Sequence, residues 1–162
     1  MGLGEDRTAM RRKDKEITDK SDIEAIIAKA RICRMGIVDG NRPYIVPLCF
    51  GYQDNTFYFH SASDGKKIEL LRSNNRVCFE LDVDCKVVGG DTACDWGMHY
   101  KSVIGFGRAE FVEDPVEKKQ ALDIIMRQYA GMEGSFEYKD SALRNTVVLQ
   151  VRVVEMTAKQ SG

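Results

Sequence analysis

Two short turn sequences constrain the fold of this chain more than any other feature. DGNRP at 39–43 and QDN at 53–55 are dense in turn-forming residues, and apolar runs flank both of them. In the run between them, 44–52, apolar side chains recur at alternate positions, which is typical of a strand. Strands joined by turns this short pair as antiparallel hairpins. The sequence therefore predicts an antiparallel sheet and not a βαβ sheet.

Six strands and three helices are predicted over the whole chain. The other strands are expected at 31–38, 56–62, 76–83, 99–112 and 146–158, and residues 84–98 are expected to be irregular. Ser21, Ser63 and Asp114 are expected to cap the three helices, since Ser and Asp favour that position. Pro47 cannot donate a ladder hydrogen bond, so we expect it at an edge, a bulge or a ligand-facing stretch. The fold is therefore predicted to be mainly β with helices, a six-stranded antiparallel β-barrel.

Length and composition suit one domain. The chain has 162 residues, and 43% of them are hydrophobic. We expect the polar residues 1–20 to form a mobile N-terminal segment, and residues 21–158 to form a single domain. The formal charge of −1 argues against a nucleic-acid binder, which needs a basic surface. No apolar run suggests a membrane span or a secretory signal, so no membrane partner is expected.

Five cysteines favour a reducing compartment, because their number is odd and none forms a CxxC pair. We therefore expect a cytoplasmic protein whose cysteines are all free. Cys33, Cys49 and Cys78 lie in apolar, strand-like runs and are expected to be small core residues.

The segment 84–98 and its flanks allow two further interpretations. Four residues there are of metal-ligand type: Cys85, Cys94, Asp95 and His99. Their spacing matches no zinc pattern, so no metal is expected. Trp96 and Tyr100 could form an aromatic wall for a planar ligand, or could plug one end of the barrel.

The segment FHSASDGKKIELLR at 59–72 is the richest in chemistry. A strand ends at His60, and a helix begins near Gly65 with Lys66 and Lys67 in its first turn. Lysines at the positive end of a helix dipole are poorly placed unless an anion binds there, which favours a phosphate site. The alternative is a capped helix with two solvated lysines. No GxxxxGK[ST] or GxGxxG pattern is present, so this is neither a P-loop nor a Rossmann turn.

His60 is one of two histidines and the candidate catalytic residue. Beside a phosphate it could donate to a ligand or transfer a proton near neutral pH. The alternative is a structural, hydrogen-bonded histidine.

Several segments, taken together and in this order, carry a resemblance to a known family. They are RRKDKEIT (11–18), ARICRMGIVDGNRPYIVPLCFGY (30–52), FYFHSASDGKKIELLR (57–72), RVCFELD (76–82) and YKSVIGFGRAEFVED (100–114). The chain resembles the FMN-binding split-barrel superfamily, which includes the pyridoxamine 5'-phosphate oxidases, and within it the nitroimidazole-resistance (Nim) branch. The resemblance implies a homodimer of six-stranded split barrels, with FMN, or in some members FAD, in clefts at the dimer interface.

The resemblance also implies roles for residues at matching positions. The isoalloxazine ring would be lined, partly through backbone groups, by Val46, Pro47, Leu48 and Cys49. The phosphate would be approached by His60, Ser61 and Ala62 and bound by Lys66 and Lys67. Near the ring would lie Ser102, Val103 and Ile104.

The sequence therefore favours an FMN-dependent oxidoreductase of the nitroreductase or nitroimidazole-resistance type, with a small molecule such as a nitro compound as substrate. The flavin would carry the electron chemistry, while the protein binds and orients. Two alternatives are a non-catalytic flavin store or sensor and a binder of another planar cofactor such as haem. A pyridoxamine 5'-phosphate oxidase-like enzyme is a weaker alternative, since the last strand offers only Arg152 and Lys159 for a basic substrate-phosphate cluster.

Overall fold

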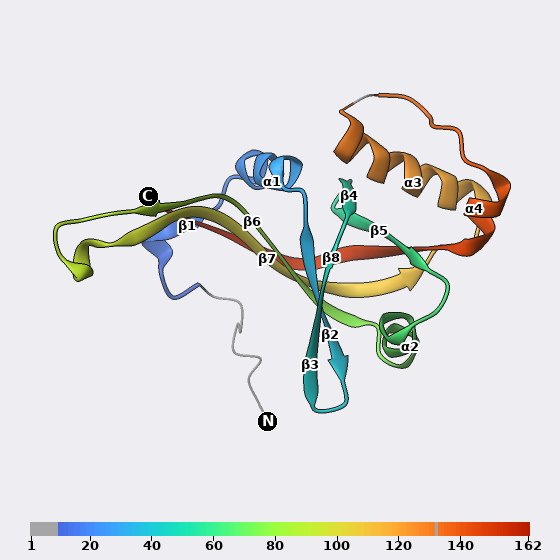
Figure 1. The fold of residues 1–162 in the computed structure, drawn as a ribbon, viewed down its shortest axis with the longest axis horizontal. Coiled ribbons are helices and arrows are strands. Elements are labelled where there is room, and N and C mark those ends of the chain that lie inside the picture. The colour runs from blue at the N-terminus through green and yellow to red at the C-terminus, as the bar shows by residue number, and fades with distance from the viewer. Residues whose placement is uncertain (1–9, 132) are drawn as a thin grey trace.

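The computed structural model describes residues 10–131 and 133–162, which form an antiparallel sheet flanked by helices (Figure 1). The strands are β1 (Glu16–Ile17), β2 (Cys33–Asp39), β3 (Arg42–Leu48), β4 (Phe50–Gln53), β5 (Thr56–Ala62), β6 (Arg76–Val88), β7 (Gly97–Phe111) and β8 (Thr146–Ser161). The α-helices are α1 (Lys20–Lys29), α2 (Lys66–Ser73), α3 (Pro115–Ala130) and α4 (Asp140–Asn145), and short 3-10 turns are η1 (Lys13–Lys15) and η2 (Ala93–Asp95).

The strand order confirms the predicted antiparallel fold. Neighbouring strands run β3-β2-β6-β7-β8-β5-β4, and β1 pairs with β8. β3 and β4 follow each other in the chain but lie at opposite ends of this order. The passage from one to the other at Cys49 therefore curls the sheet into a split barrel.

The structure has eight strands and not the predicted six, and the break at Cys49 gives one of the two extra strands. Leu48 pairs with Cys33 of β2, whereas Phe50 pairs with Phe59 of β5. The predicted strand 44–52 is thus two strands with different partners. The other extra strand is β1, whose Glu16 pairs with Lys159 of β8.

The expected mobile segment 1–20 falls partly outside the described residues. Within its described part, η1 and β1 have defined secondary structure and α1 begins at Lys20. The domain boundary at residue 20 stays a prediction.

The prediction that residues 84–98 are irregular holds for 89–96, which lie between β6 and β7, but was wrong for the residues on either side of them. After a bulge between Val83 and Lys86, β6 and β7 pair again, with Lys86 opposite His99 and Val87 opposite Met98. Residues 86–99, here called the arm, form a two-stranded ribbon that projects from the body of the protein beyond α1 (Figure 1). Its tip is η2, where the side chain of Asp95 accepts hydrogen bonds from the backbone and hydroxyl of Thr92. Turn-like residues such as Gly89 and Gly90 hid this ribbon, because they separate its two strands.

The helix caps agree with the prediction at one helix of three. The Asp114 carboxylate accepts from the backbone N–H groups of Val116 and Glu117, as predicted for α3. For α1 the cap is Asp19 and not Ser21. For α2 the cap position holds Gly65 and not Ser63.

The barrel core is built from aromatic and aliphatic side chains that alternate along the strands. Phe50, Phe57, Phe59 and Phe79 are almost fully buried, and their rings lie 4.5–6.2 Å from the ring of Phe57. A second cluster lies under α3, where Leu122 and Ile125 pack on the outer side of the sheet. This packing fixes β5 and so positions the chain that leads into α2.

Candidate functional site

The N-terminus of α2 is open. Gly65 occupies its cap position with φ 110°, and no side chain accepts from the first turn. A Cβ added at Gly65 would meet no atom within 4 Å, so there is open space beside the cap residue. Uncapped N–H groups and the positive end of the helix dipole are therefore available to an anion.

The two lysines of this helix turn point to different partners. The Lys66 ammonium lies 2.7 Å from the Asp39 carboxylate and 4.8 Å from the centre of the Tyr44 ring. The Lys66 ion pair lowers the pKa of Asp39. Lys66 therefore has a counter-ion on the β2–β3 hairpin within the same chain.

Lys67 has no such partner. Its side chain is half-buried, and burial lowers its pKa. Within residues 10–131 and 133–162, no carboxylate lies within 4.0 Å of its ammonium. A partly desolvated cation without a counter-ion is costly, so Lys67 is the residue at this site that most needs an anion.

His60 lies close enough to Lys67 to sense its charge. Desolvation lowers the pKa of His60, and the positive charge of Lys67 lowers it further. The imidazole is therefore neutral at pH 7 and can donate or accept a hydrogen bond. His60, Ser61 and Ala62 pair with β8 on one side only, since β4 ends its pairing opposite Phe59. The structure thus places His60, at this open edge of β5, near Lys67.

The segment 46–49 lies on the free edge of the sheet. β3 pairs only with β2, so Pro47 occupies an edge strand, one of the positions predicted for it. The side chains of Val46 and Leu48 pack against the barrel core, whereas Pro47 and Cys49 are exposed.

The expectation that Cys49 is a core residue was wrong, because it lies at the crossing from β3 to β4, outside the barrel. Next to it, the hydroxyl of Tyr129 in α3 accepts from the backbone N–H of Phe50 at 3.1 Å and donates to the carbonyl of Arg31. Cys33 is fully buried and Cys78 half-buried, and all five cysteines are free.

The residues predicted on β7 do not join this group in the same chain. The side chain of Val103 is fully buried in the core, so it cannot contact a ligand. Ser102 is half-buried and Ile104 is 44% exposed on the outer face of the sheet. Ile104 and Pro47 belong to one cross-strand row, with Arg34 and Glu80 between them. Three strand spacings separate them, or about 14 Å.

Sequence reasoning missed the partners that distinguish the two lysines. Asp39 and Tyr44 lie on the β2–β3 hairpin, and only tertiary packing brings them to Lys66. The hydrogen bonds of the Tyr129 hydroxyl to Phe50 and Arg31 could not be seen in the sequence either.

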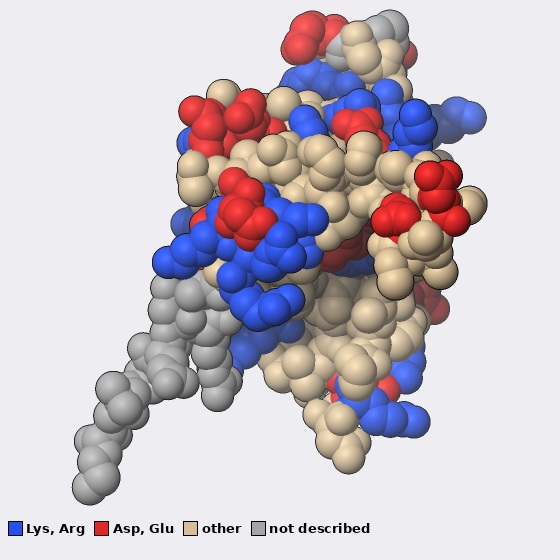
Figure 2. Space-filling model, turned by 90° about the vertical axis from the view of Figure 1, so that its left-hand side faces the viewer, with Lys and Arg blue, Asp and Glu red and all other residues tan. Residues whose placement is uncertain are grey.

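The surface has no face-wide charge of one sign on the side shown in Figure 2, where acidic and basic side chains alternate with uncharged surface. Among the described residues, no group of three or more His, Cys, Asp or Glu side chains could hold a metal ion. No helix in the described part of the chain is long and apolar enough to cross a membrane.

Comparison with known proteins gives consistent matches. Residues 19–160 match the family model described as pyridoxamine 5'-phosphate oxidase. A crystal structure from Bacteroides thetaiotaomicron VPI-5482, described as a candidate 5-nitroimidazole antibiotic resistance protein, is 44% identical and has a TM-score of 0.79. That match covers 90% of this chain and 86% of that chain.

Two further matches are more distant, and the first of them, a solved structure, agrees with the fold. The flavocytochrome Anf3 from Azotobacter vinelandii has a TM-score of 0.79 at 18% identity, over 94% of this chain and 72% of that chain. An uncharacterized protein of Rhizobium meliloti (strain 1021) is 26% identical over 65 residues, which is 40% of this chain and 42% of that protein. The match thus spans less than half the length of that relative.

The family model covers nearly the whole described chain, and the split barrel has the antiparallel order expected for it. The chain therefore belongs to the pyridoxamine 5'-phosphate oxidase-like family of split barrels.

Proposed function

We propose that the protein binds FMN and acts as a flavin-dependent oxidoreductase of the nitroreductase or nitroimidazole-resistance type. The observation that carries the proposal is Lys67, a half-buried cation without a carboxylate partner in the described chain, beside His60 at the open end of α2. A phosphate dianion there would offset the desolvation of the lysine and accept from the helix N–H groups. The similarity to the Bacteroides protein supports a nitro compound as the substrate class.

The residues present fit FMN, with FAD as the alternative flavin. Lys67, His60 and Ser61 would hold the phosphate, and the exposed edge at Pro47 and Cys49 would lie along the ring. When bound, the flavin supplies the electron-transfer chemistry. The chain binds and orients it, and His60 can hold or release a proton at an imidazole nitrogen.

We propose that the protein is a homodimer. Four large apolar side chains are exposed on the outer face of the sheet: Val38 (42%), Ile45 (64%), Ile104 (44%) and Phe106 (42%). Phe106, Val38 and Ile45 line one open pocket of about 570 Å³. An exposed apolar surface of this kind is typical of an interface. Ser102 and Ile104 lie on the same outer face and would be covered by the second copy. With all five cysteines free, we place this dimer in the cytoplasm.

A dimeric mass is expected by light scattering at micromolar concentration, because burial of the outer face drives association. A monomeric mass at that concentration would contradict the proposed homodimer.

The function is tested by two measurements on the purified protein. The absorption spectrum is expected to show flavin bands, or to show them after FMN is added. Steady-state oxidation of NAD(P)H is then expected to depend on a nitro compound. A protein that binds no flavin would overturn the proposal, and one that binds flavin without turnover would be a store or sensor instead.

Replacing His60 with alanine is expected to weaken the pH dependence of FMN binding. A nearby phosphate favours protonated imidazole, so binding takes up a proton and the affinity rises as pH falls from about 8 to about 6.5. Titrations of FMN fluorescence over this range should show a shallower rise in the variant, with little change in thermal stability. Unchanged pH dependence together with a large loss of stability would favour the structural interpretation of His60.

A further inference from the structure

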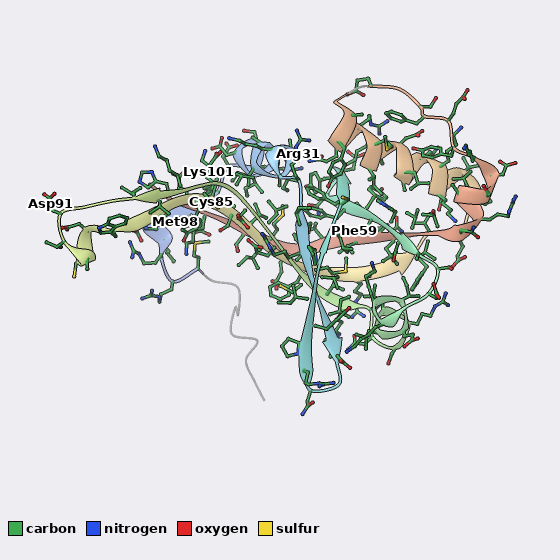
Figure 3. The ribbon with its side chains drawn as sticks, viewed as in Figure 1. Arg31, Phe59, Cys85, Asp91, Met98 and Lys101 are labelled. Carbon is green, nitrogen blue, oxygen red and sulfur yellow. The ribbon has the colours of Figure 1, made fainter. Side chains whose placement is uncertain are left out.

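The arm exposes apolar side chains that nothing in the described chain covers. Val87 is 57% exposed, Met98 48% and Trp96 60% (Figure 3 shows Met98 on the arm). A two-stranded ribbon by itself is at best marginally stable in water, and solvent-exposed apolar side chains make it less so. The arm therefore needs a surface to lie on.

The tip of the arm is acidic, and hydrogen bonds between its own residues hold it in place. Asp91 lies at its end (Figure 3), and Asp95 follows four residues later. Hydrogen bonds from Thr92 lower the pKa of Asp95 and keep it ionised. A Cβ added at Gly89 would lie 3.6 Å from the Trp96 ring, so the tip carries an aromatic ring beside its carboxylates.

The opposite end of the same strands is basic. Arg76 of β6, Arg108 of β7 and Arg152 of β8 stand directly opposite one another in the sheet. Like charges in this position destabilise a sheet. No ion pair joins any of the three to a carboxylate within residues 10–131 and 133–162. This arginine row therefore favours an acidic partner.

The outward-facing residues of β7 match one another when a second copy of the strand is laid antiparallel on the first. Along it the outward-facing residues are Met98, Tyr100, Ser102, Ile104, Phe106 and Arg108. A two-fold axis at Ser102 would place Met98 on Phe106 and Tyr100 on Ile104, each apolar on apolar. The same axis would bring Trp96 and the acidic tip to Arg108. On β6, Val87 would correspondingly approach Cys78, which faces out beside Phe106.

We propose that the arm of one copy lies, reciprocally, along the outer face of β6 and β7 of a second copy, with the acidic tip of each arm against the arginine row of the other. Both halves of the contact lie on one face of one chain, which is the property of an isologous interface. A second copy is therefore the occupant that the charge pattern fits. The inference rests on the proposed homodimer and not on flavin binding.

Trp96 reports on this contact directly, because it is the only tryptophan in the chain. In the dimer its indole is covered, and emission is expected at short wavelength. On dilution to monomer the indole is 60% exposed, and emission is expected to shift to the red. The emission and the mass are measured on the same samples, without added flavin. A dimer whose Trp96 emits as an exposed indole would overturn the proposed arm contact but not the homodimer. A chain that stays monomeric would overturn both, and neither result bears on flavin binding.

A charge exchange tests the pairing itself. Asp91→Arg is expected to raise the dissociation constant of the dimer about 10- to 100-fold, since the two-fold axis doubles each unfavourable contact. Arg108→Glu is expected to act in the same direction, and the double variant Asp91→Arg, Arg108→Glu to recover most of the loss. Glu137→Arg, an exposed change on a loop away from the face, is the matched control and should change nothing.

The outcome is read from sedimentation equilibrium, with circular dichroism to verify that each variant is folded. Equal dissociation constants for all variants would overturn the proposed arm contact. A double variant that dimerises more weakly than either single variant would also overturn it. That result would mean that Asp91 does not pair with Arg108, and that the arginine row instead binds a free anion.

Discussion

Replacing Lys67 with alanine is expected to weaken FMN binding by about 10- to 100-fold. A charge-assisted hydrogen bond is worth roughly 1.5–3 kcal/mol, and about 1.4 kcal/mol is a factor of ten. Lys67 is half-buried, so the phosphate contact is screened less than one on the open surface. The effect should be large for FMN and small for riboflavin, which has no phosphate.

Lys66→Ala is the matched control, one residue away on the same helix turn. Lys66 is paired with Asp39 at 2.7 Å, so its loss should change FMN binding less than the loss of Lys67. Both variants are titrated with FMN and riboflavin by flavin fluorescence. If Lys67→Ala binds FMN as tightly as the parent, the phosphate lies elsewhere and the proposed site fails.

The sequence predicts only in part that Lys66 and Lys67 have different roles. Neighbours on a helix point about 100° apart, so unequal roles for Lys66 and Lys67 follow from local geometry. Which of them faces a ligand depends on Asp39 and Tyr44, which reach α2 only because the β2–β3 hairpin folds toward it. No local pattern carries that information.

The strands show the same difference between features that local sequence predicts and features that depend on tertiary contacts. The turns at 39–43 and 53–55 predicted the hairpins β2–β3 and β4–β5, because turn chemistry is local. The break at Cys49 was missed, since apolar alternation runs through it while the partner strand changes. Alternation also places Val103 inside whenever Ser102 and Ile104 face out, so a family role for three successive residues could hold for two side chains at most.

Gly51→Ala is expected to destabilise the protein by about 3 kcal/mol, the upper end for overpacking a well-packed site. A Cβ at Gly51 would lie 2.6 Å from the backbone nitrogen of Ile125 and 2.7 Å from the carbonyl carbon of Ile124, both in α3. Backbone inside a helix cannot rotate away as a side chain can, so α3 must move off β4. That movement would also loosen the Tyr129 hydrogen bond to Phe50, which holds the crossing between β3 and β4 beside the proposed ring site.

Gly36→Ala separates this close approach from the general effect of replacing glycine in a strand. A Cβ at Gly36 would meet its nearest atom, the carbonyl oxygen of Cys78, at an ordinary 3.6 Å. Its unfolding free energy should therefore stay within about 1 kcal/mol of the parent, since alanine also restricts the unfolded chain. Urea unfolding at one protein concentration compares the two variants. Similar midpoints for both would mean that α3 yields easily at β4, and that the β3–β4 crossing is not held in place by this helix.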